Sequence, residues 1–87
     1  MHVISETWVG QNEGGGSTPV AWAENLRDCR KFAKEWMHFN PPPAADSDYL
    51  SLVARKVPHF GVWTPTDAKQ AKEVVLVDSK DGAWFVP

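Results

Sequence analysis

Four cationic side chains at helical spacing are the first residues here whose types and positions suggest chemistry. Arg27, Arg30, Lys31 and Lys34 follow an i, i+3, i+4, i+7 pattern, which places their charged ends on one side of a helix. Outside residues 19–39 the chain has eight acidic and five basic residues, so this cluster contrasts with an acidic background. Such a patch can bind phosphates or an acidic protein surface, or it can be the solvated face of a helix with its own ion pairs. The sequence leaves both interpretations open.

Tryptophan is the second unusual feature, with five in 87 residues. Trp22 and Trp36 fall on the apolar side of the same predicted helix, so we expect them in the core. Trp8, Trp63 and Trp84 lie on three different predicted strands, and a sheet covered on one face would leave some of their rings exposed. Exposed tryptophan near arginine is typical of binding hot spots, although small domains also use large rings to fill a core. We select Trp8 and Trp63 as candidate partner-binding residues.

The glycine-rich stretch at residues 10–18 has the composition of a phosphate-binding loop between a strand and a helix. Backbone N–H groups in such a loop can hold an anion, and the candidate residues are Gly14, Gly15, Gly16, Ser17 and Thr18. The spacing from Gly10 to Gly15 matches the Walker A pattern, but Gly16 stands where that motif requires lysine. This difference argues against a P-loop NTPase.

A second pattern in the same stretch, Gln11-x-x-Gly14-x-Gly16, resembles the acyl-CoA pyrophosphate loop of GNAT acetyltransferases, Q/R-x-x-G-x-G/A. The resemblance spans roughly residues 3–36 and implies an acyl-CoA or nucleotide bound through the loop and the helix that follows. The chain is too short for the complete sheet of that family, and Pro19 stands where the helix should supply amides. A reduced nucleotide- or acyl-CoA-binding module is therefore our alternative function.

Metal binding and nucleophilic catalysis find little support in the residue spacing. His2, His38, His59 and Cys29 are spread over three predicted elements, without an i, i+4 histidine pair or a cysteine pair. Cys29 lies in the middle of the apolar side of the predicted helix, where a packed, unreactive thiol is usual. We therefore expect no enzyme, no cofactor and no metal site.

The elements that must position these residues begin with a strand over residues 2–9, which alternates and is rich in β-branched side chains. A long amphipathic helix is predicted over residues 19–39, with Thr18 as its N-cap and Pro19 at its first position. The prolines at 41–43 end that helix, because proline cannot continue it.

The second half of the chain predicts shorter elements. Residues 49–57 favour a short helix, because apolar residues recur at 49, 50, 53 and 57, although a strand remains open for so brief a run. Gly82 suits a hairpin turn, because it adopts positive φ without strain. The other predicted elements are a strand at 59–64, a helix at 64–72, a strand at 74–78, a turn at 79–82 and a strand at 83–86.

Length and composition restrict the fold and the class of partner. A chain of 87 residues suits one α+β domain over residues 1–87, in the order β-α-α-β-α-β-β, with a mostly antiparallel sheet of about four strands on one long helix. The net charge of −2 argues against a nucleic-acid binder. No membrane-spanning run or signal peptide is visible, and one cysteine excludes an internal disulfide, so we expect a cytoplasmic protein. Its initial Met favours a complete small gene product.

These patterns together predict a small non-enzymatic module that binds another protein through the basic helix face, the exposed tryptophans or both. Inhibitors and adaptors are often of this size, and phage-encoded inhibitors of host defence, of the anti-CRISPR type, are one such class. A partner with an acidic surface would suit the cationic cluster. A tryptophan-bearing sheet face would equally serve a homodimer.

Overall fold

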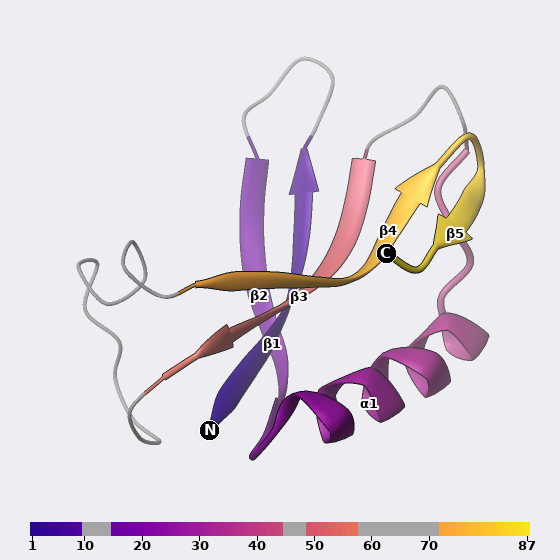
Figure 1. The fold of residues 1–87 in the computed structure, drawn as a ribbon. Coiled ribbons are helices and arrows are strands. Elements are labelled where there is room, and N and C mark those ends of the chain that lie inside the picture. Colours follow the sequence, from indigo (N-terminus) through magenta and orange to yellow (C-terminus); the bar gives the residue numbers. More distant parts are fainter. Residues whose placement is uncertain (10–14, 45–48, 58–71) are drawn as a thin grey trace.

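A five-stranded antiparallel sheet and one helix form the described part of the computed structural model, residues 1–9, 15–44, 49–57 and 72–87 (Figure 1). In chain order the elements are β1 (His2–Val9), β2 (Gly15–Ala23), α1 (Leu26–Phe39), β3 (Tyr49–Lys56), β4 (Glu73–Lys80) and β5 (Ala83–Phe85). Neighbouring strands follow the order β2-β1-β3-β4-β5. The expected α+β class is confirmed, but the described elements run β-β-α-β-β-β rather than β-α-α-β-α-β-β.

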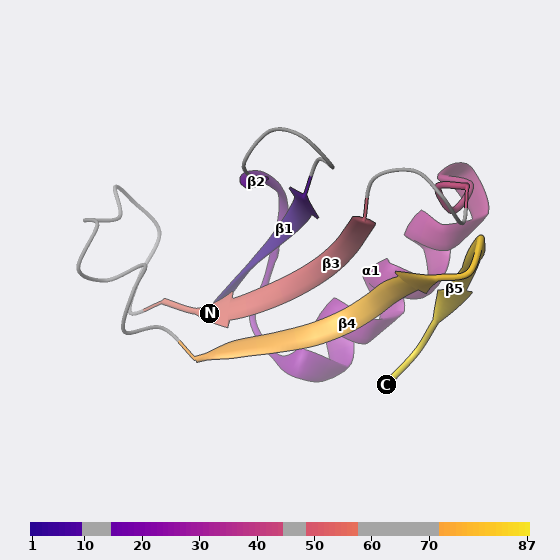
Figure 2. The ribbon, with the colours of Figure 1, turned by 90° about the horizontal axis from the view of Figure 1, so that it is seen from above.

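The helix packs against one face of the sheet and contacts β1, β2, β3 and β4. Seen from above, it lies on the far side of β3 and β4 (Figure 2). Burial of large apolar side chains, at roughly 1.5–3 kcal/mol each, holds the two layers together. The buried cluster between them consists of Ile4, Leu52, Ala54, Leu76 and Val77 from the sheet and Cys29, Ala33 and Trp36 from the helix.

The helix predicted over residues 19–39 is shorter than expected, because the first part of that range is a strand. β2 continues to Ala23, and α1 begins only at Leu26. Asn25 caps the helix, since its Oδ1 accepts a 2.9 Å hydrogen bond from the backbone N–H of Asp28. The prediction of the helix C-terminus was correct, because α1 ends directly before the prolines.

Pairing with β1 is the reason that residues 15–23 adopt a strand. β2 forms a ladder with β1 along its whole length, which satisfies backbone groups that a helix would have satisfied internally. Pro19 is tolerated there, because β2 lies at the edge of the described sheet and the register shifts beside it, between Ile4 and Ser5. Thr18 and Pro19 therefore do not start the helix, as their sequence suggested.

The short helix favoured over residues 49–57 was wrong, because residues 49–56 form the strand β3, the alternative that the sequence left open. β3 lies between β1 and β4 and pairs with both. Leu52, Val53 and Ala54 are all fully buried in succession. A central strand that is buried on both faces has a continuous apolar run rather than alternation, and such a run cannot be distinguished from a buried helix by its period.

The C-terminal hairpin was predicted, but its turn is shorter than the predicted range 79–82, because Ser79 and Lys80 belong to β4. β4 and β5 are joined by a tight turn in which Asp81 has φ 52° and Gly82 has φ 77°, the left-handed pair typical of a type I′ turn. The predicted strand at 59–64 lies outside the described residues, as does the predicted helix at 64–72 apart from its final residue.

The face of the sheet turned away from α1 is also buried at its centre. Val3 and Val53 point to this side, because they alternate with residues that face the helix, and both are almost inaccessible. The Arg55 guanidinium extends over the same face. It donates at 2.7 Å to Glu73 on β4 and at 3.5 Å to the Ser17 hydroxyl on β2. The middle of this face is therefore core.

Candidate binding groove

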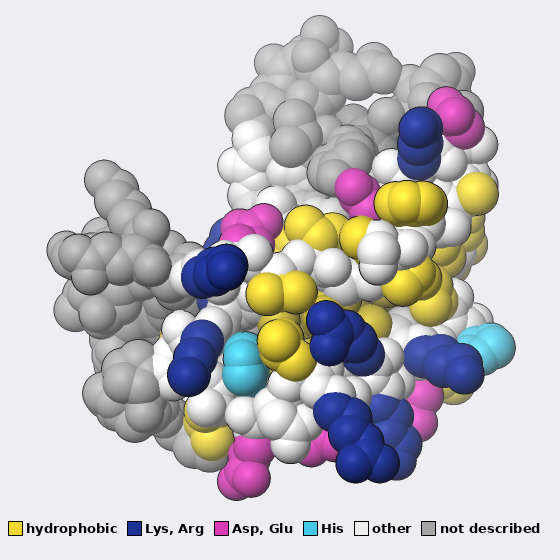
Figure 3. Space-filling model, viewed as in Figure 1, with side chains coloured by type: hydrophobic (Ala, Val, Ile, Leu, Met, Phe, Trp, Pro, Cys, Tyr) yellow, Lys and Arg dark blue, Asp and Glu magenta, His cyan; other side chains and the backbone are white. Residues whose placement is uncertain are grey.

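The basic face of α1, consisting of Arg27, Arg30, Lys31 and Lys34, is exposed to solvent as the spacing predicts. Figure 3 shows lysine and arginine side chains gathered over the helix, below hydrophobic side chains of the sheet. Within the part of the chain that the structure describes, none of the four forms an ion pair with a carboxylate. Their charges are therefore available to a ligand.

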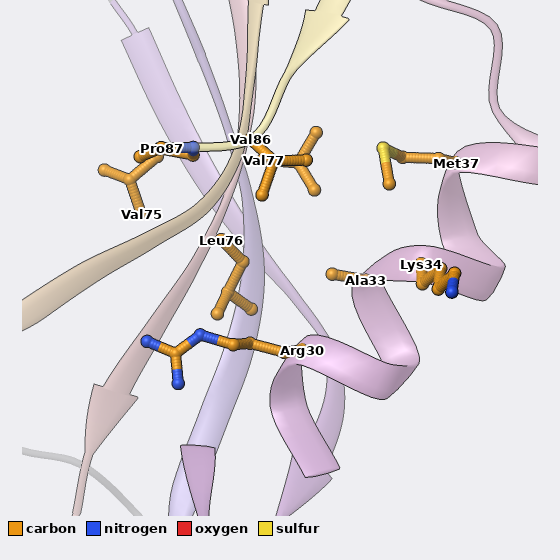
Figure 4. A pocket seen from close by; sticks show the side chains of 9 residues that line it. All are labelled: Arg30, Ala33, Lys34, Met37, Val75, Leu76, Val77, Val86 and Pro87. Carbon is orange, nitrogen blue, oxygen red and sulfur yellow. The ribbon is translucent and has the colours of Figure 1, made fainter. Parts of the chain in front are cut away.

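A groove of about 260 Å³ lies between α1 and β4, beside this basic face. Arg30 reaches from the helix toward β4, and Met37 points toward Val77 (Figure 4). The complete lining is Arg30, Ala33, Lys34 and Met37 from α1, Val75, Leu76 and Val77 from β4, and Val86 and Pro87 after β5.

The groove combines apolar walls with two cationic side chains, Arg30 and Lys34. These two side chains were predicted from their helical spacing, whereas the apolar walls were not predicted. The apolar run at 74–78 predicted the strand β4 correctly, yet nothing in it indicated that this strand would lie opposite the helix. Chemically, the arrangement suits an apolar group that has a negative charge close beside it.

The outer edge of β4 is open along the groove. β5 pairs only with Asp78, Ser79 and Lys80, at the end of β4. The earlier residues of β4 pair with β3 on one side and, in the described part of the chain, with no strand on the other. Val75 and Leu76 thus contribute both side chains and an unpaired backbone edge to the groove.

Hydrogen bonds from Trp36 and Trp84 position the end of α1 against the sheet. Trp36 donates from Nε1 to a Glu6 carboxylate oxygen at 3.1 Å, and Trp84 donates from Nε1 to the backbone carbonyl of Asn40 at 2.8 Å. The Asn40 side chain in turn donates to the carbonyl of Trp36 at 2.9 Å. The two indoles pack with centroids 5.0 Å apart and planes tilted by 51°. This contact packs the C-terminal part of α1 against the hairpin of β4 and β5.

No tryptophan in the described residues lines the groove. Trp22 was expected in the core but is 39% exposed, because it lies on the strand β2 rather than on the helix. Trp8 is exposed on β1, and its ring lies so close to Gly16 that an added Cβ there would be 2.9 Å from it. Trp63 lies outside the described residues.

The alternative function, nucleotide or acyl-CoA binding, required a helix to begin directly after the glycine-rich stretch, and α1 does not begin there. Gly15, Gly16, Ser17 and Thr18 belong to β2, and the helix starts only at Leu26. A helix N-terminus therefore does not follow these residues directly, so it cannot add its amides to theirs around a phosphate. Residues 10–14, which include Gly14, lie outside the described part of the chain.

Cys29 is a buried thiol in the helix–sheet core. Burial raises its pKa, and the charge of Asp28 raises it further, so less reactive thiolate is present near neutral pH. We expect the native protein to react with a thiol reagent such as DTNB at least about 100-fold more slowly than the protein unfolded in guanidinium, because the thiol must be exposed first. Equal rates in the two conditions would show that the thiol is accessible.

The described residues contain neither a metal-binding cluster nor a helix suited to a membrane. No group of three or more histidine, cysteine, aspartate or glutamate side chains there could hold a metal ion. No helix there is both long enough and apolar enough to span a bilayer.

Comparison of the chain with known protein families, with curated proteins and with solved structures found no significant similarity.

Proposed function

We propose that this chain is a small protein-binding module, of the inhibitor or adaptor kind, that binds a partner with an acidic surface. The observation that carries this proposal is the position of an apolar groove directly beside four exposed cations without ion pairs in the described chain. A phage-encoded inhibitor of a host defence protein would be one such module. Trp8, exposed on β1, and Trp63 remain candidate contacts for the same partner.

The composition of the groove favours a protein over a nucleic acid. Apolar side chains in the centre with arginine and lysine at the rim match the anatomy of protein interfaces. A phosphate backbone would use the cations of α1 but not the apolar walls formed by Leu76, Val77 and Met37. The net charge of −2 also opposes association with a polyanion.

Neutralising the basic face is the direct test. We expect Arg30→Gln, Lys31→Gln and Lys34→Gln together to weaken capture of the partner by about tenfold or more, because each rim charge contributes some tenths of a kcal/mol and steers the encounter. The partner would be isolated from the native host with the unmodified chain. The affinity of the variant would then be measured with both proteins purified.

A matched control removes the same number of positive charges from another part of the chain. Lys56→Gln, Lys72→Gln and Lys80→Gln remove three positive charges from exposed positions away from α1. We expect this variant to keep its affinity within about twofold, since distant exposed charges are screened at physiological salt. Equal losses in the two variants, or none in either, would exclude the basic face as the binding surface.

A further inference from the structure

We infer that the groove binds an extended acidic segment of the partner, which adds a strand to the open edge of β4 and places one apolar side chain between β4 and α1. This inference rests on the proposed function and deepens it, because it names the conformation and chemistry of the partner. Three observations support it: the open backbone edge, the size of the pocket and the charge beside it.

The open edge indicates an extended occupant. The strand β5 stops at Phe85, and Val86 and Pro87 leave the sheet without pairing. Within the described residues, the part of β4 before Asp78 therefore presents unpaired N–H and C=O groups along one wall of the groove. A peptide in extended conformation satisfies such groups by main-chain hydrogen bonds, the mode called β-augmentation.

The pocket size indicates a side chain rather than a cofactor. Sites for drug-sized ligands enclose about 300–1,000 Å³ and bury most of the ligand. The groove, at about 260 Å³, is smaller and is only partly enclosed. Leu76, Val77 and Ala33 form an apolar floor, which suits one aliphatic or aromatic side chain pointing inward from a strand.

The charge beside the pocket indicates an acidic segment. Arg30 and Lys34 line the groove from the helix side, whereas Arg27 and Lys31 belong to the same face but do not line it. The carboxylate of Glu73 on β4 is held by Arg55 at 2.7 Å, so its charge is largely compensated. A carboxylate one or two positions from the inserted side chain would therefore meet net positive charge.

A second copy of this chain is the competing occupant of a free edge. Symmetric pairing of β4 with its own copy would place the same surface on both sides of the interface. Arg30 and Lys34 of both copies would then lie in one groove region, where like charges repel. The charge therefore favours an acidic partner over a homodimer.

Selection from a random peptide library tests the inference. A phage-displayed library of peptides of about twelve residues would be panned against the whole chain, long enough to pair with a strand edge. We expect enriched peptides to share an aliphatic or aromatic residue with Asp or Glu one or two positions away. Failure to enrich any such pattern would overturn the inference.

Variants of the groove then locate binding of the most enriched peptide, labelled with fluorescein and followed by anisotropy. We expect Arg30→Glu with Lys34→Glu to raise its Kd at least about tenfold, and the control Arg27→Glu with Lys31→Glu to raise it less than about threefold. If the two pairs raised the Kd equally, the groove would not be the site where the peptide binds. The basic face would still be the binding surface, so the proposed function would stand.

A third variant tests the apolar pocket without changing the helix. Val86 lines the groove and is 61% exposed, so Val86→Glu should fold normally. We expect it to raise the Kd of the peptide at least about fivefold, while Val20→Glu, at the opposite edge of the sheet, leaves it within about twofold. An unchanged affinity in Val86→Glu would overturn the inference.

Hydrogen exchange distinguishes strand addition from side-chain contact alone. Bound peptide should slow exchange of backbone amides in the segment of β4 before Asp78 by about tenfold or more, because new inter-strand bonds protect them. Peptide binding without this protection would contradict strand addition.

Sedimentation tests the competing occupant. Dimerisation that Val86→Glu abolishes would assign the groove to a second copy instead.

Discussion

Replacing Trp36 with alanine is expected to lower the free energy of unfolding by about 3–5 kcal/mol, a large share of the roughly 4–13 kcal/mol of a domain this size. Trp36 is only 7% exposed, and its indole packs on Trp84 at 5.0 Å. The substitution leaves a cavity between helix and sheet. It also removes the N–H that donates to Glu6 at 3.1 Å, so the half-buried carboxylate loses a partner.

Chemical denaturation followed by circular dichroism measures this loss without relying on tryptophan fluorescence. Trp36→Phe should fall between the native chain and Trp36→Ala, because it keeps most of the ring but not the hydrogen bond to Glu6. Trp22→Ala is the comparison, since that ring is 39% exposed against 7% for Trp36, and it should lower the free energy of unfolding by less than Trp36→Ala does. Similar losses for the two alanine variants would show that Trp36 does not anchor the helix.

Val53→Lys is expected to prevent folding altogether. Val53 is completely buried on the face of the sheet turned away from α1. An unpaired ammonium at such a position costs several kcal/mol, which is comparable to the whole stability of a small domain. The expected result is a chain without a cooperative unfolding transition.

Val75→Lys is the control for that substitution, because Val75 lies directly opposite Val53 on β4 but is 37% exposed. A lysine there can extend its charged end into solvent, so we expect a loss below about 1 kcal/mol. Thermal unfolding of both variants provides the comparison. If Val53→Lys unfolded as cooperatively as Val75→Lys, the second face of the sheet would be an open surface and a rival to the groove as binding site.

Several elements were predictable because local interactions determine them. Alternation over residues 2–9 predicted β1, and the apolar run at 74–78 predicted β4. Gly82 predicted the hairpin turn, since a type I′ turn requires positive φ. The end of α1 was also predictable, because the three prolines after Asn40 cannot continue a helix.

β2 and β3 could not be assigned correctly, because their conformations depend on strand partners. The helical pattern assigned to residues 19–39 included Trp22, which by chance fell on the apolar arc. A ladder with β1 outweighed that local preference. In β3 the continuous apolar run at 52–54 results from burial on both faces, which requires the helix on one side and a covered face on the other.

The candidate site, like the fold, could be predicted from the sequence only in part. By itself the sequence determined the cationic spacing of Arg30 and Lys34 with their neighbours, because helical periodicity is a property of consecutive residues. It also determined that Trp36 belongs to the core. Only the tertiary structure decided that β4 lies beside α1, that β5 is too short to cover its edge, and that the cations therefore border an apolar groove. Strand pairing and burial join residues far apart in the chain, and no local pattern encodes which of those contacts form.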